Sequence, residues 1–133
     1  MIIDAMVPVY ALLNVESKGA DSMAALRKAD ELVAPASVTA ELISSFWQWG
    51  QEDVPHAKAA SLCANALRIW DALIPVEVLW ATALNLAFEH GHTPYDTLFI
   101  AAARMRGTKV LTYDKLMLKR FPEDTITVPA FLG

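Results

Sequence analysis

The sequence predicts an α/β fold of three layers, in which a short, mostly parallel sheet lies between helices on both of its faces. The main observation is that short apolar stretches, typical of strands, alternate with longer segments whose apolar residues recur at helical spacing. The second is the 55% hydrophobic content of the 133 residues, which supports a sizeable core. This length fits one domain over residues 1–133.

The first elements follow in order from the amino end. Residues 2–3 predict a short apolar strand. Residues 6–13 predict a helix, whose Pro8 is tolerated because it falls in the first turn. Residues 21–32 predict a second helix, because apolar residues recur at helical spacing with charges between them. Residues 32–34 predict the second strand, which the following proline ends.

The middle of the chain contains two longer helices. Ser37 is the expected cap of the first, which runs to about Trp49 before Gly50 ends it. Residues 54–71 predict the second, which starts near a proline. Residues 73–76 predict a short strand, placed at the edge of the sheet because of its proline.

The last part of the chain alternates in the same way. Residues 78–90 are strongly apolar and close with a glycine, as a helix does. Thr93 begins a well-formed helix, with a proline at its first position and an acid at its third, and this helix runs to Arg106. The remaining predicted elements are a strand at 109–112, a short helix at 114–120 and a last strand at 126–128.

The charges are unevenly distributed along the chain. The net charge is −4, so the chain as a whole does not predict nucleic-acid binding. Six of the eleven Lys and Arg residues nevertheless lie within one stretch, whose only acid is Asp114. They form either a solvated face with cations near helix ends or a rim that binds phosphates. These six residues are Arg104, Arg106, Lys109, Lys115, Lys119 and Arg120.

Cysteine usage and hydropathy indicate the compartment. Cys63 is the only cysteine, so no disulfide forms within the chain, and a reducing cytoplasm is the expected location. The first residues contain no basic region and no signal-like apolar stretch. No run approaches the ~20 apolar residues that a membrane span needs, so we expect no membrane partner.

Four acidic residues stand where predicted elements begin or end: Asp4, Glu41, Asp96 and Asp114. Each has an ordinary explanation, since three of them can cap or support helix starts and the fourth, Glu41, can face water in a first turn. However, Asp4 and Asp114 both follow predicted strands directly, so a parallel sheet places both at its carboxyl edge, the usual ligand side. Glu41 and Asp96 lie near helix starts that reach the same edge if each helix follows a strand or its return loop.

Four carboxylates at one edge would form an oxygen-only site. Crowded carboxylates without partnering bases either raise their pKa values or bind a divalent cation. Such a set of ligands suits Mg²⁺ or Mn²⁺ and does not suit zinc. A cation bound in this way indicates phosphodiester chemistry.

The order, types and approximate spacings of four segments resemble the PIN-domain nucleases, and especially the VapC-type toxins of toxin–antitoxin pairs. The start of the helix at Asp96 with its apolar continuation, followed by Thr112-Tyr113-Asp114, is the most specific part. The matching segments are Ile2–Asp4, Ala34–Glu41, Thr93–Ala101 and Leu111–Lys115.

The resemblance implies a PIN-like fold and a Mg²⁺- or Mn²⁺-dependent endoribonuclease. Asp4, Glu41, Asp96 and Asp114 match its acidic site, and Thr112 matches a hydroxyl residue that accompanies the last acid. Asp4 and Asp96 are expected as the closest metal ligands, with the other two acting partly through water. The resemblance also implies a homodimer and a cognate antitoxin whose tail covers the acidic cleft. The bases Arg104, Arg106, Lys109 and Lys115 are then candidates for binding the RNA backbone.

The sequence departs from the family pattern at two places. Ala5 and Met6 follow the first acid, where a small hydroxyl residue is common, and Ser44 stands where Asn is frequent. A lost hydroxyl removes support for a metal ligand, which typically costs ~10–100-fold in affinity or activity. Two alternatives therefore stay open: a housekeeping nuclease of RNA maturation, and a non-catalytic domain that keeps the fold for protein binding.

Histidines and tryptophans are the remaining candidates. We interpret His90 and His92, which flank Gly91 at a predicted helix end, as structural rather than metal-binding. The helix that contains Phe46 and Trp47 is apolar over much of its circumference. We expect part of this surface to lie in the core and part in an interface with a second subunit or an antitoxin.

Overall fold

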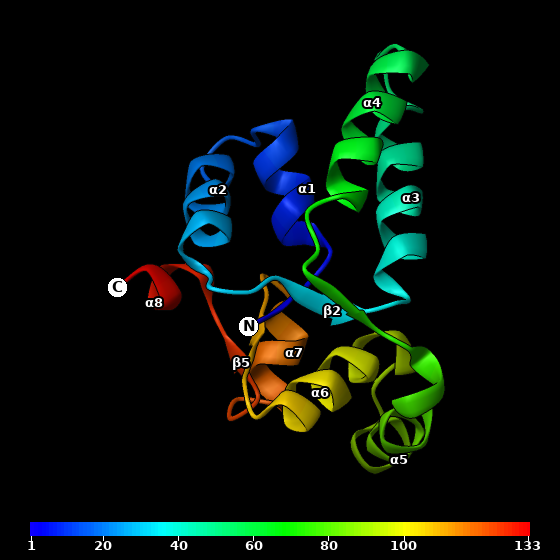
Figure 1. Ribbon diagram of the computed structural model, residues 1–133, viewed down its shortest axis with the longest axis vertical. Helices are drawn as coiled ribbons and strands as arrows, with labels where there is room; N and C mark the ends of the chain where they lie inside the picture. The colour runs from blue at the N-terminus through cyan, green and yellow to red at the C-terminus, as the bar shows by residue number, and fades with distance from the viewer.

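A computed structural model describes residues 1–133 and contains one five-stranded sheet (Figure 1). Every pair of neighbouring strands is parallel, and the order across the sheet is β3-β2-β1-β4-β5. The predicted α/β class with a parallel central sheet is therefore confirmed. The strands are β1 (Ile2–Ile3), β2 (Val33–Pro35), β3 (Ala72–Ile74), β4 (Val110–Leu111) and β5 (Thr125–Ile126).

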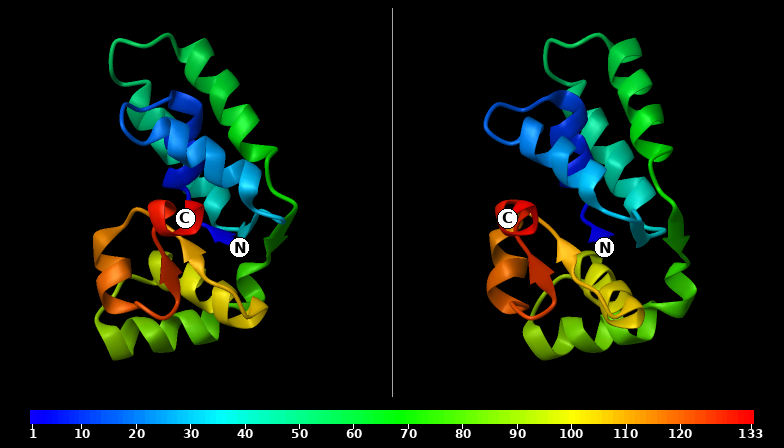
Figure 2. Two further views of the ribbon diagram at one scale, coloured as in Figure 1. Left: turned by 90° about the vertical axis from the view of Figure 1, so that its left-hand side faces the viewer. Right: turned by 60° about the vertical axis from the view of Figure 1, so that its left-hand side comes forward.

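Helices cover both faces of the sheet and make the three layers. Helices α1 and α2 lie on one side, together with the pair α3–α4, whereas α5, α6 and α7 lie on the other (Figures 1 and 2). No helix is long and apolar enough to cross a bilayer. The helices are α1 (Met6–Leu13), α2 (Gly19–Lys28), α3 (Val38–Trp49), α4 (His56–Leu67), α5 (Trp80–His90), α6 (Pro94–Arg106), α7 (Lys115–Arg120) and α8 (Val128–Leu132), with a 3-10 turn at Val76–Val78.

Strand β1 lies at the centre of the sheet and divides the core into two parts. Its two residues point to opposite faces, as successive residues of a strand do. Ile2 belongs to the larger apolar cluster, with Phe99 of α6, and Ile3 belongs to a smaller cluster with Val7 of α1 and Leu111 of β4. All of these side chains are fully buried, so the sheet and both helical layers are packed together.

Helix α6 is the most deeply buried helix, because residues 97–103 are all buried. Thr93 caps it by accepting a hydrogen bond from the backbone N–H of Tyr95 at 3.3 Å, and Pro94 occupies its first position. The predicted start of this helix is therefore confirmed. Burial on all sides fixes the position of the first turn, which carries Asp96.

The carboxyl end of the chain differs from the prediction. A strand at 126–128 is wrong, because the strand ends at Ile126 and a short helix begins at Val128. The side chain of Thr127 caps this helix by accepting a bond from the N–H of Ala130 at 3.2 Å, and Pro129 lies in its first turn. A threonine cap followed by a proline outweighs the β propensity of the stretch.

Two details of the earlier helices also differ from the prediction. Helix α2 ends at Lys28 and not at residue 32, since Ala29 is already extended, with φ −63° and ψ 130°. Ser37 lies at the start of α3 but does not cap it, and its buried Oγ has no hydrogen-bond partner.

Candidate active site

The four acids predicted from the sequence line one pocket at the carboxyl edge of the sheet. Asp4, Glu41, Asp96 and Asp114 come from the end of β1, from α3, from α6 and from the start of α7. We call this the acidic pocket; it encloses about 350 Å³. Its lining residues are Asp4, Ala5, Met6, Tyr10, Lys18, Glu41, Ser45, Asp96, Tyr113 and Asp114.

Asp4 is held on both of its oxygens. Strand pairing of β1 with β4 sets Asp4 beside Thr112, because the Asp4 N–H donates to the carbonyl of Leu111 at 3.0 Å. The hydroxyl of Thr112 donates to Asp4 Oδ2 at 2.6 Å, and the N–H of Ala5 donates to Oδ1 at 2.8 Å. The register of the central strand pair therefore fixes this carboxylate.

Thr112 also links Asp4 to the fourth acid. Its Oγ1 accepts a hydrogen bond from the N–H of Asp114 at 3.0 Å. Asp114 caps α7, because its Oδ1 accepts from the N–H groups of Leu116 at 2.9 Å and Met117 at 3.0 Å. Asp114 thus caps α7 and also lines the acidic pocket. The structural and the functional interpretation of this residue are therefore compatible.

Asp96 has a partner that the sequence analysis did not foresee. Its Oδ2 lies 2.7 Å from Nε2 of His92, whose side chain is 1% exposed. The signal for this contact was the spacing of four residues between the histidine and the acid. The structural interpretation of His92 therefore missed its contact with an acid of the pocket.

Glu41 is the one acid with an orphan oxygen. It lies in the first turn of α3, and its Oε2 is buried without any hydrogen-bond partner. An unpartnered buried carboxylate oxygen is costly unless the group is protonated or meets a cation. The expectation that Glu41 could simply face water is wrong for this oxygen.

Burial and mutual repulsion shift the pKa values of three of these carboxyl groups upward. Desolvation raises the pKa of Asp4 from 3.8 to about 6; the hydrogen bonds from Thr112 and Ala5 oppose this shift. Desolvation, with the charges of Asp4 and Asp96, raises the pKa of Glu41 to about 7. The pKa of Asp96 is also raised by burial, which exceeds the lowering effect of the bond with His92.

These shifts indicate a site that gains from a positive charge. The carboxyl groups lie close enough to repel one another, and all four supply hard oxygen ligands. As the side chains lie, no three His, Cys, Asp or Glu groups are arranged around one common metal position. The four carboxyl groups therefore have the chemistry that a divalent cation needs. In this structure their side chains do not converge on a single metal position.

One cation, Lys18, lines the acidic pocket, although it was not among the bases predicted from the sequence to bind RNA. The Lys18 ammonium lies 4.8 Å from the ring centroid of Tyr10 and 5.4 Å from that of Tyr113. The two rings meet edge to face with centroids 5.2 Å apart. The Tyr113 hydroxyl also bonds with Ser22 Oγ at 2.6 Å, so this aromatic support of Lys18 is anchored to α2.

The basic residues selected from the sequence lie elsewhere. Arg104 forms two bonds with Asp124 at 3.1 and 3.0 Å, and Arg106 lies 3.5 Å from Glu31. A helix rises 1.5 Å per residue, so Arg104 is roughly 12 Å along α6 from the acid at its start. Lys109 precedes β4 and so lies at the opposite edge of the sheet. Of these four bases, only Lys115 is adjacent in sequence to a residue that lines the pocket, Asp114.

The two departures from the family pattern differ in their surroundings. Ser44 is exposed and does not line the acidic pocket, whereas its neighbour Ser45 does. The Ser45 hydroxyl lies 3.8 Å from the sulfur of Met6. Ala5 lines the pocket and supplies only its backbone N–H to Asp4.

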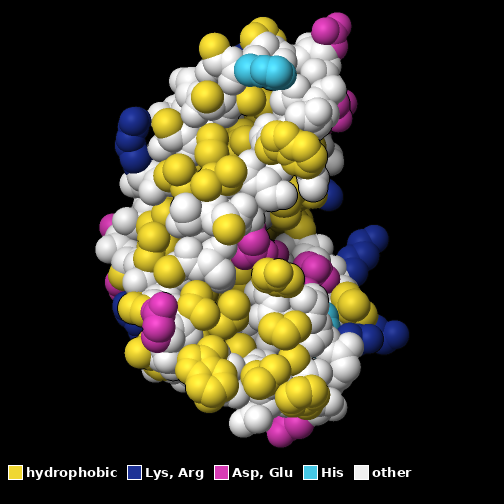
Figure 3. Space-filling view, turned by 90° about the vertical axis from the view of Figure 1, so that its right-hand side faces the viewer, with side chains coloured by type: hydrophobic (Ala, Val, Ile, Leu, Met, Phe, Trp, Pro, Cys, Tyr) yellow, Lys and Arg dark blue, Asp and Glu magenta, His cyan; other side chains and the backbone are white.

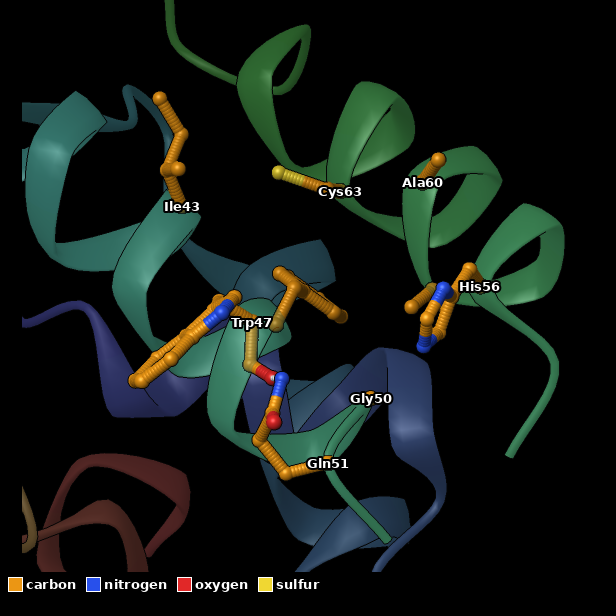
Figure 4. A pocket seen from close by; sticks show the side chains of 9 residues that line it. Ile43, Trp47, Gly50, Gln51, His56, Ala60 and Cys63 are labelled. Atoms are coloured by element: carbon orange, nitrogen blue, oxygen red, sulfur yellow. Dashed lines mark hydrogen bonds between the residues drawn. The ribbon is translucent and has the colours of Figure 1, made fainter. Parts of the chain in front are cut away.

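An apolar groove lies between α3 and α4 (Figure 4). Its lining residues are Ile43, Phe46, Trp47, Gly50, Gln51, His56, Ala59, Ala60 and Cys63. Trp47 and Ile43 of α3 are 63% and 51% exposed, and Cys63 of α4 faces them across the groove. Hydrophobic side chains gather on the face that carries α3, α4 and α5 (Figure 3). Phe46 is therefore buried in the core and Trp47 lies at the surface. The expectation that the exposed part forms an interface stays a prediction.

Similar solved structures share this fold. A crystal structure of a Pyrobaculum aerophilum protein matches with a TM-score of 0.73 and 20% identity, covering 98% of this chain and 92% of that one. A toxin–antitoxin complex from Klebsiella pneumoniae matches with a TM-score of 0.69 and 15% identity, covering 96% of each chain. VapBC2 from Rickettsia felis, solved with a DNA fragment from their promoter, matches with a TM-score of 0.66 and 15% identity over 95% and 96%.

The sequence pattern of the PIN domain matches residues 1–123, and the chain belongs to the PIN domain family. This confirms the resemblance drawn from the four acidic segments. The chain is also similar to Ribonuclease VapC3 from Pyrobaculum aerophilum. It is 26% identical over 127 residues, which cover 92% of this chain and 95% of that protein.

Proposed function

We propose that this PIN domain is a metal-dependent endoribonuclease of the VapC toxin type. The observation that carries the proposal is the acidic pocket, in which four carboxyl groups from distant parts of the chain meet at the carboxyl edge of the sheet. The similarity to Ribonuclease VapC3 supports RNA as the substrate. Two of the matched structures are of toxin–antitoxin proteins, which supports the toxin assignment.

Mg²⁺ or Mn²⁺ is the proposed cofactor. Asp4 and Asp96 are the proposed closest ligands, and Glu41 and Asp114 complete the set. The orphan oxygen of Glu41 and the raised pKa values of Asp4 and Glu41 are relieved when a cation enters. A bound divalent cation supplies water activation and neutralises charge that builds on the scissile phosphate.

The protein's own groups orient the reactants. Thr112 fixes the plane of the Asp4 carboxylate through its 2.6 Å hydrogen bond. Lys18 stands at the pocket with its ammonium over two aromatic rings, so it is placed to contact a phosphate of the RNA. A single cation here offsets part of the repulsion that the acids and the net charge of −4 exert on RNA.

Protein partners are part of the proposal. The exposed Trp47 and Ile43 offer the type of apolar surface that a homodimer or an antitoxin covers. The matched structure from Klebsiella pneumoniae is of a toxin–antitoxin complex, which supports an antitoxin as a partner. We place the activity in the cytoplasm, where a free thiol such as Cys63 stays reduced.

A cleavage assay tests the proposal. The purified chain is incubated with a mixed single-stranded RNA in Mn²⁺, in Mg²⁺ and in EDTA, and products are followed on a gel. Cleavage that needs the metal and disappears in Asp96→Asn supports the proposal. The matched control is Asp53→Asn, which removes the same charge from an exposed residue between α3 and α4. Equal cleavage by the wild type in EDTA and in Mn²⁺ would refute metal dependence.

A further inference from the structure

We propose that His92, held by Arg120, is a positioning residue that fixes the carboxylate of Asp96. This inference rests on the proposed metal site, because Asp96 is one of its expected closest ligands. Neither His92 nor Arg120 lines the acidic pocket, so both act from behind it. The chain of contacts runs from the end of α7 through His92 to the first turn of α6.

His92 is engaged on both ring nitrogens. Nε2 lies 2.7 Å from Asp96 Oδ2, and Nδ1 lies 3.1 Å from Nη1 of Arg120. The same Nη1 donates to the carbonyl of Gly91 at 2.8 Å. The imidazole edge also packs against Phe121, with ring centroids 5.6 Å apart. A side chain that is 1% exposed and bonded in this way has no freedom to turn.

The partners determine which nitrogen carries the proton. A guanidinium has only donors, so Nδ1 of His92 must be the acceptor in its contact with Arg120. In the neutral imidazole, the hydrogen then lies on Nε2, which donates to Asp96 Oδ2. Arg120 therefore selects the tautomer that His92 needs in order to hold the acid.

The backbone places the ring as firmly as the side chains do. Gly91 ends α5 with a positive φ of 59°, a conformation that favours glycine. The next N–H, that of His92, donates to the carbonyl of Ala87 at 3.2 Å. This turn brings His92 back against α6, four residues before Asp96 on the chain.

The consequence concerns the two oxygens of Asp96. His92 occupies Oδ2, so the orientation of the carboxylate is fixed and Oδ1 is left for another partner. Histidine and carboxylate groups that orient a metal ligand typically change metal affinity or activity by ~10–100-fold when they are removed. The alternative is that His92 has only a packing role in the core. An apolar side chain of similar size would then leave metal binding and activity unchanged.

Two substitutions separate these alternatives. His92→Leu fills the space without a donor, whereas His92→Gln keeps an amide donor near the position of Nε2. We expect His92→Leu to weaken Mn²⁺ binding, measured by calorimetry, by ~10–100-fold. His92→Gln should recover most of that loss, and kcat for RNA cleavage should fall more than KM rises in the leucine variant. His90→Leu is the matched control, because His90 is an exposed residue at the end of α5 that does not line the acidic pocket.

A second readout needs no metal. Nitrogen-15 NMR of the metal-free protein should show a protonated Nε2 and a bare Nδ1 for His92, and Arg120→Met should lose this preference. Unchanged Mn²⁺ affinity in the folded His92→Leu variant, or a proton on Nδ1 of His92, overturns the inference. If the wild type itself binds no Mn²⁺, the proposed function fails. The NMR measurement of the His92 tautomer still tests whether Arg120 sets the contact between His92 and Asp96.

Discussion

Removing the charge of Asp4 should stabilise the metal-free protein at pH 8. The pKa of this carboxyl is raised in the folded state from 3.8 to about 6, so the fold holds the proton more tightly than the unfolded chain does. The stability that this tighter proton binding gives the fold is fully present below pH 3.8 and is lost as the pH rises through 6. At 1.36 kcal/mol per pKa unit, ionised Asp4 costs about 3 kcal/mol at pH 8.

Asn at this position removes that cost and introduces a smaller one. The Ala5 N–H still meets an oxygen, but the amide nitrogen of Asn then faces Thr112, so the Thr112 hydroxyl loses the acceptor for its own proton. One mismatched hydrogen bond costs about 1 kcal/mol. The expected gain of Asp4→Asn is therefore about 2 kcal/mol at pH 8. It falls to about zero at pH 4.5, where wild-type Asp4 is mostly protonated in the fold.

Urea unfolding in EDTA at pH 4.5 and pH 8 measures this difference. Asp53→Asn is the control, because it removes an exposed acid and should change stability little at either pH. If Asp4→Asn is no more stable than the wild type at pH 8, burial and repulsion do not act on this carboxyl as described. The same conclusion follows if the gain is equal at the two pH values.

Three further predictions follow from the acidic pocket. Asp96→Asn should reduce Mn²⁺-dependent cleavage of RNA at least ~100-fold while circular dichroism shows an intact fold; cleavage at the wild-type rate would make Asp96 only a helix-start residue. Lys18→Ala should raise KM for RNA more than Arg104→Ala does, because Lys18 lines the pocket and Arg104 does not. It should also reduce the slope of RNA affinity against salt concentration by about 1. Equal effects of the two substitutions would contradict a contact between Lys18 and the RNA. Thr112→Val should lower the free energy of unfolding by about 1–3 kcal/mol at pH 8, and an unchanged urea midpoint would show that its bonds to Asp4 and Asp114 contribute nothing.

Elements with strong local signals were predictable from the sequence. Helix α6 has a threonine cap, a proline at its first position and a glycine after its end, and its predicted bounds are confirmed. The sheet is parallel as expected, because its strands alternate with helices. The convergence of the acids followed from the same reasoning, since Asp4 and Asp114 each come just after a strand and parallel strands share a carboxyl edge.

Features that depend on contacts between distant segments were not predictable. Lys18 reaches the pocket because α1 and α2 fold back on the sheet, and nothing in its neighbourhood distinguishes it from other surface lysines. The role of Arg120 depends on the end of α7 lying against Gly91, twenty-nine residues away. The Arg104–Asp124 pair likewise joins residues whose proximity arises only from the pairing of β4 with β5.

The wrong boundary at the carboxyl end has a local cause. Residues 126–128 combine two β-branched apolar side chains with a threonine, which favours a strand on propensity. The side chain of Thr127 instead caps α8, and Pro129 fits the first turn of that helix. The capping signal was present in the sequence and was outweighed in the prediction by the apolar character of its neighbours.

Anomalous scattering from a crystal soaked in Mn²⁺ tests the central claim most directly. The proposal predicts a peak in the acidic pocket, within bonding distance of Asp4 and Asp96, and the loss of that peak in Asp96→Asn crystals treated in the same way. A fully soaked crystal with no peak beside these carboxylates, or with Mn²⁺ bound only at another place on the molecule, would contradict it.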